Sequence, residues 1–193
     1  MQPNPYEIFR TWLGQAQSTP AIAEPTAMTL ATATPEGIPS ARIVLLKAYD
    51  ERGFVFYTNT QSRKGRELDA NPHAALVFYW MPLDKQVRIE GSISRVSDVE
   101  ADAYFASRER LKQAGAWASL QSQPLDARGT LEQRTTAIEA QYAGRDIPRP
   151  PHWTGYRLTP QSLEFWHQRD GRLHEREIYT RTGGSWAHTL LYP

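Results

Sequence analysis

The spacing of apolar residues predicts one amphipathic helix near the start of the chain, followed by a long series of short strands. Residues 5–17 place Ile8, Phe9, Trp12 and Leu13 on one helical face. β-Branched and aromatic residues between turn signals predict strands at residues 27–33, 42–48, 54–58, 74–80, 86–96, 153–158, 163–167, 173–179 and 186–190.

Turn and capping residues predict where these elements end. Asp-Glu-Arg-Gly at 50–53 and the pair Gly183-Gly184 predict hairpin turns. Ser97, with Glu100 three residues later, has the form of a capping box and predicts a helix that continues through Tyr104 and Phe105. Further helices are expected at residues 62–70, 112–120 and 126–142, and the proline-rich residues 147–151 should be extended.

The order of these elements predicts a protein that is mainly β with peripheral helices, in the α+β class. Strands outnumber helices, and the helices gather in the middle rather than alternating with strands as they do around a parallel sheet. An antiparallel sheet that curls into a barrel, with helices packed outside, fits this order. The length suits a single domain over residues 1–193.

Composition excludes several classes of function. The chain has no cysteine, so disulfides and thiolate chemistry are excluded and a reducing, cytoplasmic location is expected. With 22 basic and 21 acidic side chains, no nucleic-acid partner is expected. No membrane partner is expected either, because no apolar run approaches roughly 20 residues and no secretory signal pattern opens the chain. Five scattered histidines lack metal-ligand spacing, so no metal is expected.

A polar turn at residues 57–62 leads into a helix whose first turn carries Ser62, Arg63 and Lys64. Basic residues are unfavourable at a helix N-terminus, because the helix dipole is positive there. An anion would relieve this cost, so free amides, a hydroxyl and two cations together suggest a phosphate cradle. A serine-capped surface helix with solvated cations is the alternative.

A second basic cluster is the segment 172–176. In a strand, the side chains of Arg172, His174 and Arg176 share one face. Their positive charges repel one another unless a bound anion or nearby glutamates neutralise them. Two further pairs are weaker signals. Arg42 and Lys47 would face opposite ways in a regular strand, and Tyr104 would share a helix face with the residue four positions later, Arg108.

Seven short motifs occur in the order seen in pyridoxine/pyridoxamine 5′-phosphate oxidases, and the chain resembles that family from about Pro5 to Pro193. Dispersed motifs in a shared order are far more specific than any one of them. The motifs are RIVLLK, FVFYTN-x-x-SRKGREL, the single Gln86 in DKQVRIEG, YFASR, GAWASLQS, EFW and RLHER.

The resemblance implies a split β-barrel that forms a homodimer and builds two FMN sites at the subunit interface. Arg63 and Lys64 would meet the FMN phosphate. The residues that match the family's cofactor contacts are Arg42, Ile43, Val44, Leu45, Leu46, Lys47, Tyr57, Thr58, Arg63, Lys64, Gln86, Gln121, Ser122, Trp166 and Arg176.

The resemblance also implies a substrate site. Tyr104 and Arg108 would help to hold the substrate phosphate, and Arg172 and His174 would lie against the pyridine ring as the catalytic pair. Lys112 stands where the family usually has a serine that binds the same phosphate. A lysine could do so with more charge and less geometric precision, or it could point into solvent. The matching substrate contacts, with Lys112 added, are Lys47, Tyr104, Arg108, Lys112, Arg172 and His174.

The implied reaction is oxidation of pyridoxine and pyridoxamine 5′-phosphate to pyridoxal 5′-phosphate. A hydride would pass from the substrate C4′ carbon to flavin N5, and oxygen would reoxidise the flavin to give hydrogen peroxide. A flavin oxidase of the phenazine-precursor type shares EFW and LHER and is the alternative enzyme. The motifs are also compatible with a non-catalytic FMN- or pyridoxal-phosphate-binding protein and with a flavin reductase. Many family members carry a longer N-terminal extension over the substrate, so no lid residues are assigned here.

Overall fold

The computed structural model describes residues 4–193. Its helices are α1 (Pro5–Gln17), α2 (Arg63–Ala70), α3 (Asp98–Ala106), α4 (Arg110–Ala118) and α5 (Thr130–Gln141), with short 3-10 turns η1 (Met81–Leu83) and η2 (Asp170–Arg172). Its strands are β1 (Ala27–Ala33), β2 (Pro39–Leu45), β3 (Ala48–Asp50), β4 (Gly53–Asn59), β5 (His73–Trp80), β6 (Lys85–Arg95), β7 (Trp153–His167), β8 (Glu175–Thr182) and β9 (Ser185–Leu191).

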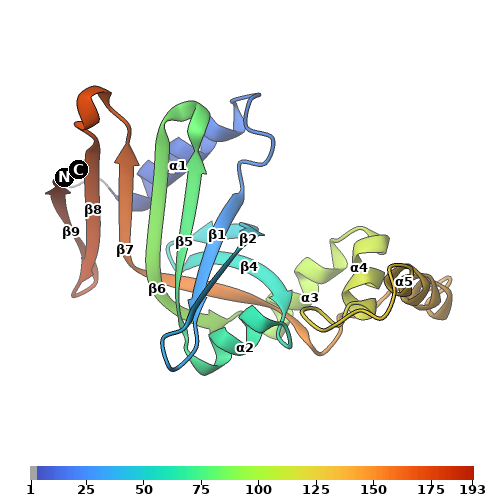
Figure 1. The fold of residues 1–193 in the computed structure, drawn as a ribbon. Coiled ribbons are helices and arrows are strands. Elements are labelled where there is room, and N and C mark those ends of the chain that lie inside the picture. Colours follow the sequence, from blue (N-terminus) through green and yellow to red (C-terminus); the bar gives the residue numbers. More distant parts are fainter. Residues whose placement is uncertain (1–3) are drawn as a thin grey trace.

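Every strand pair in the sheet is antiparallel, which confirms the predicted fold class. The nine strands follow the order β2-β1-β5-β6-β7-β4-β3, and β8 and β9 continue from β7 (Figure 1). The first half of β7 pairs with β4 and its second half pairs with β8, while β6 runs beside nearly all of it. The sheet therefore curls and divides around β7, as in a split barrel.

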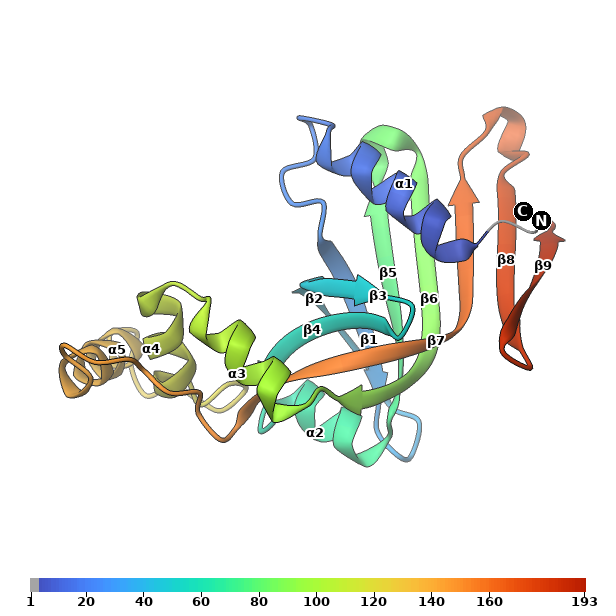
Figure 2. The same ribbon diagram turned by 180° about the vertical axis from the view of Figure 1, so that it is seen from behind.

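The core lies between α1 and one face of the curled sheet. Phe9 of α1 is fully buried, and its ring packs edge-on against Phe54 and Phe78 at 4.9 and 5.2 Å. Figure 2 shows α1 across this face, whereas α3, α4 and α5 extend away to one side. Alternate residues of β5 and β6, such as Leu76 and Ile89, point into the same core. Their neighbours therefore lie on the opposite face, over which Figure 1 shows no helix of the part described.

Several predicted strand boundaries were wrong, and two of them have a clear structural reason. Residues 153–167 form one strand rather than two, because Pro160 pairs with Gly91 at an irregularity in the β6–β7 register, where its missing N–H is tolerated. Gly91 is needed there, since a Cβ atom would lie 2.1 Å from the carbonyl oxygen of Thr159. The predicted strand 42–48 is instead interrupted after Leu45, because the chain leaves β1 and joins β4.

Helix prediction succeeded where a cap was visible in the sequence. Ser62 and Ser97 cap α2 and α3 by accepting from the backbone N–H groups of Gly65 and Glu100. The later helices were less well placed, since α4 begins at Arg110 and α5 only at Thr130. Within residues 4–193 no helix combines the length and apolarity needed to cross a membrane.

Candidate functional site

A pocket of about 300 Å³ opens where β2 and β4 meet the start of α2 and the end of α3. Four of its side chains are cationic, and its lining contains no carboxylate, so the pocket is suited to anionic groups. The lining residues are Arg42, Ile43, Val44, Leu45, Lys47, Tyr57, Thr58, Lys64, Tyr104, Arg108, Gln121 and Trp153.

The interruption of the strand after β2 brings Arg42 and Lys47 to the same pocket, although a regular strand would have separated them. The backbone N–H of Leu46 donates to Thr26 and that of Lys47 donates to Val55, so the chain changes partners at this point. The side chain of Leu46 is buried in the main hydrophobic core. Of the RIVLLK motif, therefore, Leu46 does not offer its side chain to the pocket.

The start of α2 gathers the residues of the predicted phosphate cradle. The Lys64 ammonium donates to Thr58 Oγ1 at 3.2 Å and to Gln121 Oε1 at 3.0 Å. The backbone N–H of Arg63 donates to Ser122 Oγ at 3.2 Å. Burial and then the nearby charge of Arg42 lower the pKa of Lys64, and the opposing charge of Glu67 does not offset them.

Beneath this cradle lies Glu67, a residue that sequence analysis missed. Its carboxylate is only 6% exposed and accepts from Arg63 Nε at 2.8 Å and from Arg42 Nη2 at 3.3 Å. Thr32 and Ser40 donate to it at 2.5 and 2.6 Å. Burial alone would raise its pKa, but the hydrogen bonds from Ser40, Thr32 and Arg63 and the charge of Arg42 outweigh burial and lower the pKa of Glu67 to about 2. The carboxylate thus stays charged and anchors both arginines.

An aromatic stack forms the other wall of the pocket. The rings of Tyr57 and Tyr104 stack at 4.0 Å, and Trp153 continues the stack at 5.1 Å from Tyr57. The guanidinium of Arg108 lies 4.9 Å from the Trp153 ring centre, and burial lowers the pKa of Arg108. Arg108 Nη1 is buried and finds no hydrogen-bond acceptor among residues 4–193. A buried donor left without an acceptor fits an anionic ligand at this point.

The predicted helical pairing of Tyr104 with Arg108 needs a correction. Helix α3 ends at Ala106, so Arg108 lies in the turn that follows, yet both side chains reach the same pocket. Lys112 borders an adjoining hollow of about 390 Å³ together with Lys47 and Arg108. Its ammonium is exposed and pairs with Glu109 Oε1 at 3.0 Å.

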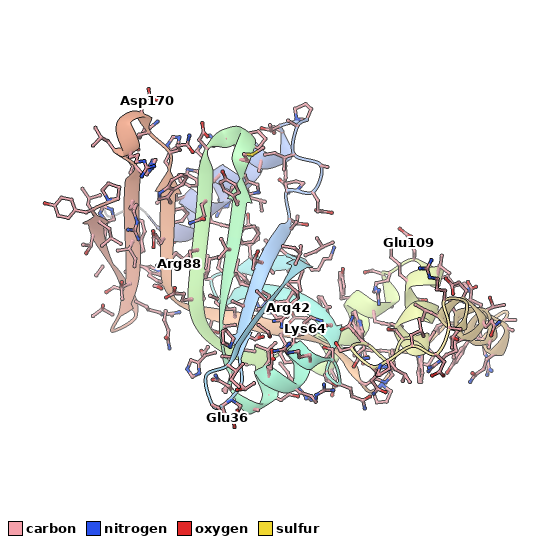
Figure 3. The ribbon with its side chains drawn as sticks, viewed as in Figure 1. Glu36, Arg42, Lys64, Arg88, Glu109 and Asp170 are labelled. Atoms are coloured by element: carbon pink, nitrogen blue, oxygen red, sulfur yellow. The ribbon has the colours of Figure 1, made fainter. Side chains whose placement is uncertain are left out.

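The remaining candidate residues lie on a different part of the sheet. Gln86 on β6 is paired with Trp166 on β7, which is paired in turn with Arg176 on β8. Figure 3 shows Arg42 and Lys64 side by side near the lower middle of the molecule, whereas Asp170, which begins the turn before β8, lies far from them at the upper left. One chain therefore brings the candidate residues together as two separate groups.

The prediction that Arg172, His174 and Arg176 share one strand face was wrong. Residues Asp170–Arg172 form a 3-10 turn in which Gly171 and Arg172 have φ of 64° and 61°, and β8 begins only at Glu175. A left-handed backbone at these two residues cannot continue a strand. His174 instead packs against the Trp166 ring, with ring centres 4.8 Å apart, and its Nδ1 accepts from the backbone N–H of Arg169 at 3.2 Å.

Comparison with known protein families matches both parts of the chain. Residues 15–142 match the family described as pyridoxamine 5′-phosphate oxidase. Residues 153–193 match the pyridoxine 5′-phosphate oxidase C-terminal dimerisation region. The second match includes β7, β8 and the turn between them.

Comparison with individual proteins points to the same family. A pyridoxine/pyridoxamine 5′-phosphate oxidase of Myxococcus xanthus is 55% identical over 191 residues, which cover 99% of this chain and 92% of the relative. The enzyme of the same name from Zymomonas mobilis is 51% identical, with 100% of both chains covered.

Solved structures share the fold. PhzG from Burkholderia lata, in complex with tetrahydrophenazine-1-carboxylic acid, superposes with a TM-score of 0.93 at 36% identity and covers 100% of this chain and 94% of its own. An FMN-binding protein of Nostoc punctiforme related to pyridoxamine 5′-phosphate oxidase superposes with a TM-score of 0.79 at 18% identity, with full coverage of both chains at 100%. This chain belongs to the pyridoxine/pyridoxamine 5′-phosphate oxidase family.

Proposed function

We propose that this protein is an FMN-dependent oxidase that converts pyridoxine and pyridoxamine 5′-phosphate to pyridoxal 5′-phosphate, with oxygen as electron acceptor and hydrogen peroxide as by-product. Curated relatives that match nearly the whole chain at 51–55% identity carry the corresponding name. The observation that carries the proposal is the pocket with four cations and no carboxylate. An enzyme whose cofactor and substrate both end in phosphate needs such a pocket.

The cations of the site fall into two groups, one for each phosphate. Arg42 and Lys64 line the pocket beside the start of α2, and Arg63 joins them through Glu67. The positive end of a helix together with two or three cations suits the FMN phosphate. The anchored geometry of this group supports its assignment to a rigidly held cofactor.

The second group surrounds the end of α3 and suits the substrate phosphate. The pocket and the adjoining hollow share the side chains of Lys47, Tyr104 and Arg108. A substrate bound in the hollow would therefore contact a cofactor bound in the pocket. The buried donor of Arg108 would gain an acceptor from that phosphate. Lys112 would add a third positive group once its ammonium leaves Glu109.

Bound FMN would supply the hydride acceptor and would pass the electrons to oxygen. The protein's part is to fix the substrate against the flavin ring and to balance charge. A guanidinium is a poor base, so Arg172 would clamp the substrate ring. His174 is held by Trp166 and by the Arg169 backbone. Its imidazole would hydrogen-bond the hydroxyl of the substrate ring and could accept the proton of that hydroxyl.

We propose that the complete site is formed by two copies of the chain. Gln86, Trp166 and Arg176 lie away from the pocket of their own chain, so a partner would have to present them to it. Apolar side chains on the helix-free face support pairing through that face, since Ile43 and Tyr79 are 64% and 55% exposed there. The match of residues 153–193 to a dimerisation region supports the same assembly. A cytoplasmic location, supported by the absence of cysteine, is part of the proposal.

The rival substrate is a phenazine precursor, because PhzG shares the fold at 36% identity. The stated reaction is tested with purified protein and FMN. Pyridoxine 5′-phosphate should yield an aldehyde product and an equal amount of hydrogen peroxide. A yellow protein that leaves this substrate unchanged would contradict the substrate assignment, and a colourless protein that cannot be reconstituted with FMN would contradict the cofactor assignment.

A further inference from the structure

An ion-pair cluster on the helix-free face of the sheet joins Arg176 of the proposed site to Glu164 and Arg88, which have no role in that site so far. Glu164 on β7 is only 4% exposed and pairs with arginines from both neighbouring strands. Its Oε1 accepts from Arg176 Nε at 2.8 Å, and its Oε2 lies 2.7 Å from Arg88 Nη2. Arg88 also pairs with the more exposed Glu90 at 3.0 Å. Three adjacent strands are therefore joined by one carboxylate.

The register of the sheet puts this cluster beside the second group of candidate residues. Arg88 is opposite Glu164, two residue pairs along the strands from Gln86 opposite Trp166. Side chains of directly opposed residues lie on the same face, and residues two apart on a strand share it. Arg176 is the direct partner of Trp166. Figure 3 shows Arg88 on this part of the sheet.

The cluster restrains the guanidinium of Arg176 from two sides. Its Nε donates to Glu164, and its Nη1 donates to the carbonyl oxygen of Tyr192 at 3.0 Å. The hydrogen bond that Arg176 donates to Glu164 raises the pKa of Arg176. A free arginine side chain has several rotatable bonds, so these contacts remove freedom that ligand binding would otherwise have to remove.

Stability alone is a weak reason for such a cluster. A buried carboxylate loses its hydration, and well-packed apolar residues often replace a buried ion pair without loss of stability. The contact with Arg88 is close, yet Glu164 Oε2 has no well-directed hydrogen bond within residues 4–193. The arrangement is better explained by the direction it imposes on Arg176.

We propose that Glu164, held in turn by Arg88, is a positioning residue that sets the Arg176 guanidinium against the flavin. This inference rests on the proposed function, in which Arg176 contacts FMN. Glu164 and Arg88 themselves touch neither cofactor nor substrate in this scheme. Because Arg42, Arg63 and Lys64 already supply the cations for the FMN phosphate, we assign the contact of Arg176 to the ring system, and riboflavin should depend on it as FMN does.

The test is a double-mutant cycle on FMN binding to the apoprotein, followed by quenching of flavin fluorescence. Glu164→Gln keeps the shape of the side chain but removes its charge, and we expect about tenfold weaker binding of both FMN and riboflavin. In a background that already carries Arg176→Ala, the same substitution should change affinity by less than about twofold. The matched control is Glu90→Gln, which removes the other carboxylate partner of Arg88 and should leave affinity within about twofold of the parent.

A purely structural role would give a different pattern. The proposal would be overturned if Glu164→Gln alone caused no loss of FMN affinity. It would also be overturned if the loss in the double variant equalled the sum of the losses in Glu164→Gln and Arg176→Ala. The visible absorption spectrum of FMN at saturation gives a second readout, and we expect it to change in Glu164→Gln and not in Glu90→Gln. An unchanged spectrum in both would also overturn the proposal.

Two further measurements distinguish a wrong role for Glu164 from a variant that does not assemble and from a protein that does not bind FMN. If Glu164→Gln does not assemble, Glu164→Asp keeps the charge, draws the carboxylate back by one methylene group, and enters the same cycle with an expected loss of about threefold. A parent protein that binds no FMN refutes the proposed function itself. A parent that binds FMN, with a variant that binds it equally well, refutes only the role of Glu164.

Discussion

Replacing Glu67 by glutamine should destabilise the apoprotein by an amount that follows from its environment. In the folded protein the pKa of Glu67 falls from 4.5 to about 2. At about 1.4 kcal/mol for each pKa unit, this corresponds to about 3 kcal/mol of unfolding free energy near neutral pH. For a chain of this length, about 3 kcal/mol amounts to a fall in Tm of roughly 6–12 °C.

The sign of the pH dependence is set by the lowered pKa. A carboxylate with a depressed folded-state pKa contributes stability that is fully present above its unfolded value of 4.5 and is lost as the pH falls toward about 2. The difference in stability between the parent and Glu67→Gln should therefore be constant from pH 7 to about 5. Below about pH 4.5 it should shrink, because the parent loses the charge that the variant never had.

The assay is urea unfolding of the apoprotein at fixed protein concentration, since ligand and partner binding would add to the apparent stability. The control is Glu7→Gln, which removes an exposed carboxylate paired with Arg10 and should cost less than about 0.5 kcal/mol. A loss in Glu67→Gln no larger than in this control would refute the reasoning. A difference that stays constant through pH 4 would refute the assigned pKa.

Four variants and one measurement of mass test the rest of the site. Arg63→Ala should weaken FMN by about 1.5–3 kcal/mol but spare riboflavin, and equal losses in a binding titration would show that Arg63 does not meet the phosphate. Arg172→Ala and His174→Ala should retain FMN yet lose about tenfold or more in kcat/KM, about 1.4 kcal/mol, and unchanged rates would remove both from the substrate site. Lys112→Ala should raise KM for pyridoxine 5′-phosphate by about three- to tenfold with kcat unchanged, and an unchanged KM would mean that Lys112 stays with Glu109. Light scattering at micromolar concentration should give about twice the chain mass of 22.0 kDa, and an active monomer with bound FMN would contradict the two-chain site.

Local patterns in the sequence determined most of the elements. Apolar spacing predicted α1 with its observed bounds, and two capping serines located the starts of α2 and α3. These features depend on residues three or four positions apart, and short-range geometry is the same wherever a segment lies in a fold. The absence of cysteine likewise required no structure to exclude disulfides and thiolate chemistry.

The arrangement of the charged residues was decided by the tertiary structure. Glu67 meets Arg42 across 25 residues of sequence, and Lys64 meets Gln121 across 57. In the sequence Glu164 is only one of several glutamates near the basic segment, and its link to Arg88 on β6 depends on the strand order. The predicted strand face of Arg172 and His174 failed because a left-handed turn precedes β8. Strand pairing brings such distant residues together. Whether their side chains lie on the same face depends on the register, because a shift of one residue in the pairing would move every side chain of a strand to the opposite face.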